Sequence, residues 1–227
     1  MTGRRIVGAV RRRVGGNDVR EWRGATAYWR EHYATGGNSG SGSYGRLAAF
    51  KADVLNKFVA DHGVGSVIEL GCGDGNQLSL ATYPTYVGLD VSEIALEMCI
   101  RRFPADPSKS FYLYRPECTV DNAGLFQAEL AMSLDVVYHL IEPAGYESYM
   151  KALVAAGEKW LVIFGPDTDD YAPHVSVKAR KFTRWIDDNA PDWELHEHIP
   201  NRFKYTGDPK VSTPADFYFF RRVEQAG

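Results

Sequence analysis

The segment that most constrains this chain is VIELGCGDGN, residues 67–76, where a short apolar run leads directly into three closely spaced glycines. The run 64–70 is typical of a short buried strand. Glycines at positions 71, 73 and 75 allow backbone conformations that side chains disfavour, and they let the backbone approach a ligand closely. In open α/β sheets, ligands bind beyond the carboxyl ends of the strands, at such turns. The segment therefore predicts a ligand site.

Two acidic residues indicate the kind of ligand. Glu69 precedes the turn, where a carboxylate suits a cationic group. Asp90 ends a second predicted strand, 86–91, and lies 17 residues beyond Gly73, where an acid can accept hydrogen bonds from both hydroxyls of a ribose. A dinucleotide fingerprint would need a third glycine where Asn76 stands, so a pyrophosphate is less well supported. The alternative is a tight strand-to-helix turn with Asp90 as a strand-end cap.

The rest of the chain alternates between predicted strands and helices, which indicates a mainly parallel sheet covered on both faces. A loop containing Gly207, Pro209 and Pro214 joins the last two strands, which we expect to pair antiparallel at one end of the sheet. Ser43 and Ser92 are plausible helix caps. The further predicted strands are 110–114, 130–136, 160–164, 193–199 and 216–223, and the predicted helices are 25–34, 46–62, 93–103, 146–156 and 177–189, with a short helix after the glycines.

The amino-terminal part differs from this pattern. Residues 1–23 hold seven arginines against Asp18 and Glu21, and we interpret 1–24 as a basic lead that is either a solvated tail or a helix for a membrane surface or partner. The lead lacks the apolar stretch of a secretory signal. The remainder is acidic, which argues against a nucleic-acid channel. Three cysteines without a Cys-x-x-Cys pair fit a reducing cytoplasm.

Residues 25–227 are expected to form one domain. Within it, the aromatic helix 25–34 precedes GGNSGSGSYG, residues 36–45, which is too rich in glycine and serine for regular structure. Residues 25–45, the helix and the loop together, are either a lid that excludes water from the ligand site or an amino-terminal helix simply packed on the sheet.

The stretch ELGCGDGN followed by GLDVS resembles motif I and the acid after it in class I S-adenosylmethionine (SAM)-dependent methyltransferases, and the resemblance spans roughly residues 46–165. It implies an α/β fold with a seven-stranded, mostly parallel, doubly wound sheet, an antiparallel final strand and helices on both faces. It also implies SAM as cofactor. Glu69, Gly71 and Gly73, with Cys72 between them, would line its methionine half, Asp90 would hold the ribose, and Val91 would contact the adenine.

The run LAMSLDVVYHLIEP, residues 130–143, resembles the fourth strand of that family and the loop that faces the sulfonium. It places Asp135 at the cofactor and His139 where a base would remove the acceptor proton. His139 is otherwise a buried structural histidine. His174 and Arg180 would reach the same cleft or belong to an ordinary loop. Paired acids at 169–170 and 187–188 would bind a hard cation or be solvated helix ends, and we expect no metal.

The methyl acceptor is not fixed by these residues. The glycine-serine loop, SLDVVYHLIE and HVSVKARKFTRW together resemble bacterial methyltransferases found with glycan-assembly enzymes. Our leading hypothesis is therefore O-methylation of a sugar, a glycan or a similar small polar metabolite, in the cytoplasm at the inner face of the membrane. The alternatives are an N-methyltransferase of a small molecule or protein, and a nicotinamide-dependent oxidoreductase or non-catalytic nucleotide-binding module.

Overall fold

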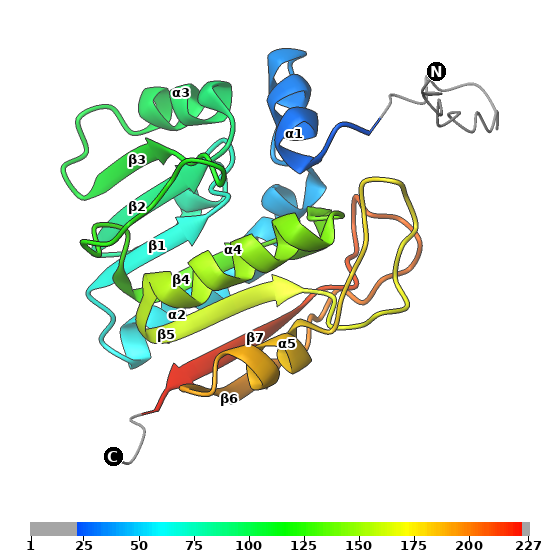
Figure 1. Cartoon of the computed structure of the whole chain (residues 1–227). Coiled ribbons are helices and arrows are strands. Elements are labelled where there is room, and N and C mark those ends of the chain that lie inside the picture. Colours follow the sequence, from blue (N-terminus) through cyan, green and yellow to red (C-terminus); the bar gives the residue numbers. More distant parts are fainter. Residues whose placement is uncertain (1–21, 224–227) are drawn as a thin grey trace, which may run out of the picture.

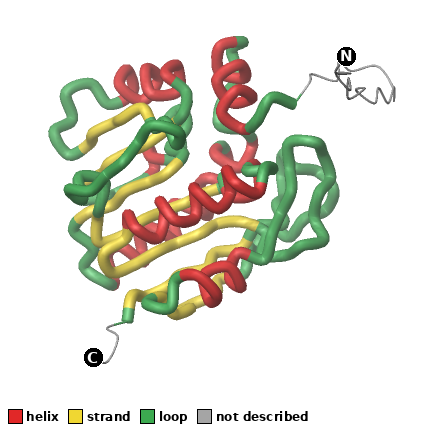
Figure 2. The backbone as a smooth tube through the Cα atoms, viewed as in Figure 1, coloured by secondary structure: helices red, strands yellow, loops and turns green. Residues whose placement is uncertain are grey.

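The computed structural model describes residues 22–223, and its centre is one seven-stranded sheet (Figures 1 and 2). The order across the sheet is β3-β2-β1-β4-β5-β7-β6. All neighbours pair in parallel except β7, which runs antiparallel to both β5 and β6. This confirms the predicted sheet and its reversed last strand. The strands are β1 (Ser66–Leu70), β2 (Thr85–Asp90), β3 (Lys109–Leu113), β4 (Ala128–Leu134), β5 (Gly157–Gly165), β6 (Trp193–Ile199) and β7 (Asp216–Arg222).

Helices cover both faces of the sheet because the central strands are apolar on both sides. Val67 of β1 packs in one core cluster with residues of α2 (Gly45–Asp61) and α3 (Glu93–Arg102). Its neighbour Ile68 faces the other way, into a cluster with α4 (Pro143–Ala156) and α5 (Phe182–Asn189). Successive side chains of a strand point to opposite faces, so one strand feeds both cores.

The first helix, α1 (Ala25–Ala34), belongs to neither layer. It lies at the carboxyl-terminal end of the parallel strands, the side to which their arrowheads point (Figure 1). The segment between α1 and α2 contains only a short 3₁₀ turn, Ser41–Ser43. Together they cover the edge where ligands bind in folds of this type.

One predicted helix cap was correct and three other local predictions were wrong. Ser92 caps α3 by accepting a hydrogen bond from the amide of Ala95 at 3.3 Å. Ser43 does not cap α2, because Tyr44 occupies the cap position and the Ser43 carbonyl instead accepts from the side chain of Asn76. The short helix expected after the glycines is a 3₁₀ turn, Leu78–Leu80.

The predicted helix 177–189 begins only at Phe182. Ahead of it the backbone donors are used elsewhere: the amide of Lys178 donates to Tyr138 O and the amide of Ala179 donates to Tyr171 O, both at 2.8 Å. These bonds tie the segment to other loops, so a helical path there would leave those carbonyls without their partners.

The basic lead predicted at 1–24 lies outside the described residues apart from its last three positions. Those three have contacts: the Trp22 indole N–H donates to Glu142, and Arg23 and Gly24 line the cavity described below. Within residues 22–223, no helix is long and apolar enough to cross a membrane.

Candidate functional site

A cavity of about 530 Å³ opens at the carboxyl ends of β1, β2 and β4, between the sheet edge and α1. This size suits a ligand as large as a nucleoside derivative. The cavity brings together all the residues predicted to bind the cofactor and the histidine predicted as the base. These are Glu69, Gly71, Cys72, Gly73, Asp90, Val91, Asp135 and His139.

The glycine turn after β1 leaves no room for side chains. Gly71 and Gly73 have φ values of 90° and 60°, which only glycine adopts readily. A Cβ on Gly71 would lie 2.5 Å from Val136, and one on Gly73 would lie 2.2 Å from the Ser39 hydroxyl. The amide of Gly71 donates to Leu89 O at 2.7 Å, which joins the turn to β2. The turn is therefore fixed by backbone bonds and closely covered.

Asp90 ends β2 beside this turn. One of its carboxylate oxygens accepts from the amide of Gly73 and the other from the amide of Ser92, both at 2.9 Å. Burial raises the pKa of Asp90 to about 6, although these amides favour the ionised form. Each oxygen keeps a further lone pair for a ligand. The alternative role of Asp90 as a strand-end cap is thus also met, and the two roles are compatible.

Glu69 is 4% exposed and forms one wall of the cavity. The Tyr86 hydroxyl donates to it at 2.6 Å. Burial raises the pKa of Glu69 from its ordinary 4.5 to about 7, and the Tyr86 bond and the charge of Lys51 only partly oppose this. A cation bound nearby would stabilise the ionised form of Glu69 and lower its pKa.

Lys51 is a cavity residue that sequence reasoning missed. It lies on α2, is 1% exposed, and places its ammonium 2.7 Å from the Asp135 carboxylate. Asp135 itself follows β4 with a φ of 61°, a conformation that aspartate tolerates better than most residues, and also accepts from the Tyr138 hydroxyl at 2.9 Å. A buried charge needs a partner, so each of these two lining residues stabilises the other.

Gln77 also lines the cavity, and its side chain is incompletely bonded. Its Nε2 donates to Ala48 O at 3.1 Å, whereas its Oε1 is buried without a hydrogen-bond partner. An unpaired buried acceptor costs about 1–3 kcal/mol, so such atoms in native structures have a reason, of which a missing ligand is one. A ligand that carries a donor, as SAM does on its amino group, fits this wall.

His139 faces the cavity from the turn after β4. Its Nδ1 lies 2.9 Å from the carbonyl of Ser176, so the neutral ring carries its proton there and leaves Nε2 as an acceptor. Burial lowers the pKa of His139 below 6.5, only partly offset by that carbonyl and by Asp135. The Trp29 ring meets the His139 ring edge to face at 5.1 Å. His139 is thus a neutral, oriented base candidate.

The loop after β5 holds the His139 loop in place. Arg180 donates to the carbonyls of Leu140 and Ile141, both at 2.6 Å, and its guanidinium lies over the Tyr146 ring. The prediction that Arg180 reaches the cleft was wrong, because its guanidinium is bonded to these carbonyls and does not line the cavity. His174, the other candidate there, bonds to the Ser176 hydroxyl at 2.9 Å and does not line the cavity.

The segment after α1 is fastened to the glycine turn through Asp74. One Asp74 oxygen accepts from the amide of Ser39 at 2.9 Å and from the Tyr44 hydroxyl at 2.8 Å. The Ser39 hydroxyl in turn accepts from the Asp74 amide at 2.9 Å and bonds to the Tyr33 hydroxyl. Burial favours protonation of Asp74, but these bonds and one from Asn76 hold its pKa below the ordinary value. The segment therefore covers the glycine turn and is held there by hydrogen bonds to the Asp74 carboxylate.

Beside His139 the cavity has a mixed lining. Trp29 supplies an aromatic wall against the His139 ring, Glu142 supplies a carboxylate, and Ser148 supplies a hydroxyl. Glu117 also lines the cavity, but it follows β3, whose end is joined to Asp90 by the bond from the Tyr114 amide to the Asp90 carbonyl. The part of the cavity beside His139 is where an acceptor molecule would meet the cofactor half.

Other polar clusters of the described residues lie away from the cavity. Asp169 accepts from the amide of Lys181 and from Arg184 at the start of α5, and Asp187 and Asp188 are exposed on that helix. No group of three or more His, Cys, Asp or Glu residues within 22–223 is arranged to hold a metal ion.

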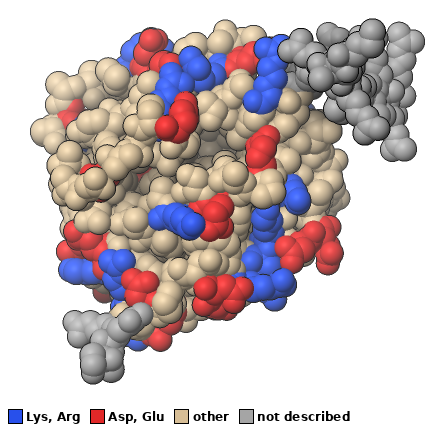
Figure 3. Space-filling view, in the orientation of Figure 1, with Lys and Arg blue, Asp and Glu red and all other residues tan. Residues whose placement is uncertain are grey.

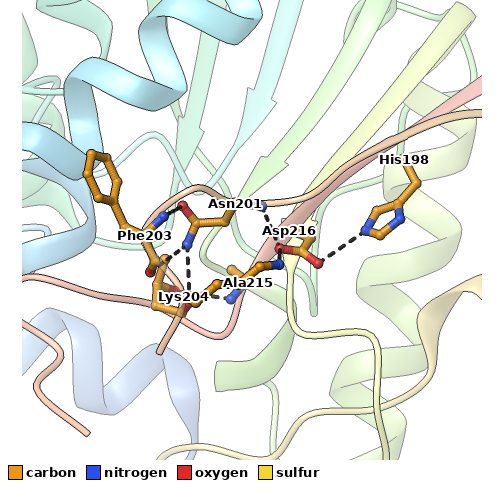
Figure 4. Close-up of polar contacts among 7 residues, drawn as sticks. His198, Asn201, Phe203, Lys204, Ala215 and Asp216 are labelled. Atoms are coloured by element: carbon orange, nitrogen blue, oxygen red, sulfur yellow. Dashed lines mark hydrogen bonds and ion pairs between the residues drawn. The ribbon is translucent and has the colours of Figure 1, made fainter. Parts of the chain in front are cut away.

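A histidine–aspartate pair at the start of β7 is structural (Figure 4). His198 lies 3.1 Å from Asp216, which also accepts from the amide of Asn201 at 2.7 Å. The Asn201 side chain donates to the carbonyls of Phe203 and Thr213. This network closes the long loop between β6 and β7, and neither His198 nor Asp216 is among the cavity-lining residues.

Comparison with known proteins places this geometry in context. No family model matches the sequence, and no curated protein matches it. Solved structures do. Magnesium protoporphyrin IX methyltransferase from Synechocystis PCC 6803, with bound SAM, superimposes with a TM-score of 0.62 at 13% identity over 92% of this chain and 100% of that one. The chain has the class I methyltransferase fold.

Two further structures share this methyltransferase fold. The N-methyltransferase NodS from Bradyrhizobium japonicum WM9, in complex with S-adenosylhomocysteine (SAH), gives a TM-score of 0.62 at 15% identity over 79% of this chain and 87% of that one. The methyltransferase domain of bacterial CtHen1-C gives 0.60 at 19% identity over 79% and 100%. At identities below 20%, the likeness extends to the fold and not to the acceptor.

Proposed function

We propose that this protein is a SAM-dependent methyltransferase. The observation that carries the proposal is the convergence of three features in one cavity: the glycine turn at Gly71 and Gly73, the buried carboxylate of Asp90, and the histidine His139 with its Nδ1 bonded to a carbonyl. Three structural neighbours described above are methyltransferases, and two of them were solved with SAM or SAH bound.

The proposed division of labour follows from the chemistry. SAM supplies a methyl group on a sulfonium, which is already activated for displacement. The protein then has to hold the acceptor in line, exclude water and take up a proton. Asp90 would bind the ribose hydroxyls, Glu69 would balance positive charge, Val91 would lie against the adenine, and the neutral His139 would accept the proton through Nε2.

We further propose a hydroxyl of a sugar, glycan or similar small polar metabolite as acceptor. A hydroxyl must lose a proton on methylation, which gives a neutral histidine a task. Trp29 offers an aromatic platform and Glu142 a hydrogen-bond acceptor for hydroxyl groups. The same carboxylate also suits a cationic amine, so the N-methyltransferase alternative stays open.

A nucleic-acid acceptor receives less support, although one structural neighbour is the small RNA methyltransferase HEN1. On the face shown in Figure 3, basic and acidic side chains lie interspersed rather than gathered into a basic stripe. Phosphate backbones need concentrated positive charge.

Calorimetric titration with SAM, SAH and NAD tests the cofactor part of the proposal. We expect SAM and SAH to bind and NAD to give no heat; NAD binding alone would instead support the oxidoreductase. A methyl-transfer screen with sugars, amines and RNA then tests the acceptor. Transfer to amines but not to hydroxyls would replace the O-methylation proposal with the N-methyl alternative.

We also propose that the arginines of residues 1–21 keep the enzyme near an anionic membrane, where each basic residue adds about 1 kcal/mol of attraction. Deletion of 1–21 should weaken sedimentation with phosphatidylserine vesicles and leave thermal unfolding cooperative. Deletion should stop before Trp22, which contacts Glu142. Equal sedimentation of the two forms would remove the membrane proposal.

A further inference from the structure

One wall of the cavity carries two polar groups that the functions assigned so far do not use. Lys51 projects from α2, and the amide of Gln77 docks onto the same helix one turn earlier, at Ala48 O. Ala48 and Lys51 are three residues apart on α2, so both groups are attached to this helix within one turn of each other. Both line the cavity, and Gln77 follows the glycine turn in the chain.

The two groups have complementary chemistry. The Lys51 ammonium is 1% exposed and can donate three hydrogen bonds, of which Asp135 takes one. Gln77 is 7% exposed, and its Oε1 can only accept but has no donor. One buried cationic donor beside one unpaired acceptor matches a zwitterion, which carries a carboxylate and an ammonium on one carbon.

This wall of the cavity is rich in carboxylates, and Lys51 is the cation beside it that a ligand carboxylate can bind. Glu69, Asp90 and Asp135 all line the cavity, and a ligand carboxylate placed among them would be repelled without a nearby ammonium. Arg23, the other lysine or arginine among the described lining residues, lies next to Gly24, at the end of the cavity where Glu142 lies.

We infer that Lys51 and Gln77 recognise the α-amino-acid end of the cofactor, Lys51 binding its carboxylate and Gln77 Oε1 accepting from its ammonium. This inference rests on the proposed function. It implies that Lys51 and Gln77 make the site prefer a nucleoside that carries an amino acid over adenosine thioethers that lack one of its two charged groups. Asp135 holds the Lys51 ammonium in position.

Calorimetry with three ligands tests the assignment without any turnover. SAH carries both groups, 5′-S-(3-aminopropyl)-5′-thioadenosine lacks the carboxylate, and 5′-S-(3-carboxypropyl)-5′-thioadenosine lacks the amine. We expect the wild-type protein to bind each shortened ligand at least about tenfold more weakly than SAH, the scale of a hydrogen bond to a charged group. Equal affinities for all three ligands would overturn the inference with no variant needed.

Variants then assign each group to its residue. In Lys51→Met the aminopropyl ligand should bind within about twofold of SAH, while the penalty for the carboxypropyl ligand persists. Gln77→Met should show the reverse pattern. Lys57→Met is the matched control, because Lys57 lies on the same helix, exposed and paired with Asp61. It should keep both penalties.

Loss of the Lys51 ammonium leaves Asp135 unpaired, so the ligand comparison is repeated with Lys51→Met/Asp135→Asn, which removes both charges. A full carboxylate penalty in a folded variant without Lys51 would refute its role, and a full ammonium penalty in Gln77→Met would refute that of Gln77. Failure of the wild-type protein to bind SAH at all is a different result, because it contradicts the proposed function itself.

Discussion

Replacement of Glu69 by glutamine should make the unliganded protein more stable at alkaline pH. The Glu69 pKa rises from 4.5 to about 7, mainly through burial. The folded state therefore holds this proton more tightly than the unfolded chain does. The stability that the protonated group contributes is fully present below pH 4.5 and is lost as the pH rises towards 7. At 1.36 kcal/mol per pKa unit, the loss is about 3 kcal/mol by pH 8.

Glutamine cannot ionise, and its carbonyl oxygen can still accept the hydrogen bond that the Tyr86 hydroxyl donates at 2.6 Å. In urea unfolding, Glu69→Gln should therefore gain about 2 to 3 kcal/mol relative to the wild-type protein between pH 5 and pH 8. Glu97→Gln, on the exposed surface of α3, is the control and should show no such trend. A Glu69→Gln difference that is the same at both pH values would refute the burial argument.

Three further substitutions test other parts of the site. Asp90→Ala should weaken SAH binding by about 1.5 to 3 kcal/mol in calorimetry, and unchanged affinity in the folded variant would contradict ribose binding. His139→Ala should keep SAM affinity and lower kcat by about 10²- to 10⁴-fold. The wild-type kcat should fall below pH 6.5, because burial lowers the pKa of His139, and this fall should be absent in the variant. Near-normal turnover would make His139 a packing residue. Tyr44→Phe removes a donor to Asp74 and should raise amide hydrogen exchange over residues 35–44, and unaltered exchange would show that this bond does not fasten the segment.

The fold was predictable because its signals are local. Alternating apolar runs and helical stripes set the strand and helix order, and the closely spaced glycines with the acid at position 90 marked one sheet edge. Parallel strands bring their carboxyl ends together, so residues after β1, β2 and β4 meet without further information. That is why Glu69, Asp90 and His139 were found from the sequence.

The missed features depend on contacts distant in sequence. Lys51 looked like a surface lysine, but its partner Asp135 is 84 residues away. One local signal existed: Lys51 shares a helix face with Leu47 and Leu55, both buried, so a charged residue stood within the apolar stripe. No such signal marks the bonds from Ser39 to Asp74 across the glycine turn.

The structure of the protein with SAH bound is the measurement that tests the account most directly. The account predicts SAH in the cavity after β1 and β2, with both ribose hydroxyls within hydrogen-bond distance of the Asp90 carboxylate and the adenine against Val91. It also predicts the amino-acid end beside Lys51 and Gln77. SAH bound elsewhere, or with its ribose away from Asp90, would contradict the central claim that this glycine turn and acid form a SAM site.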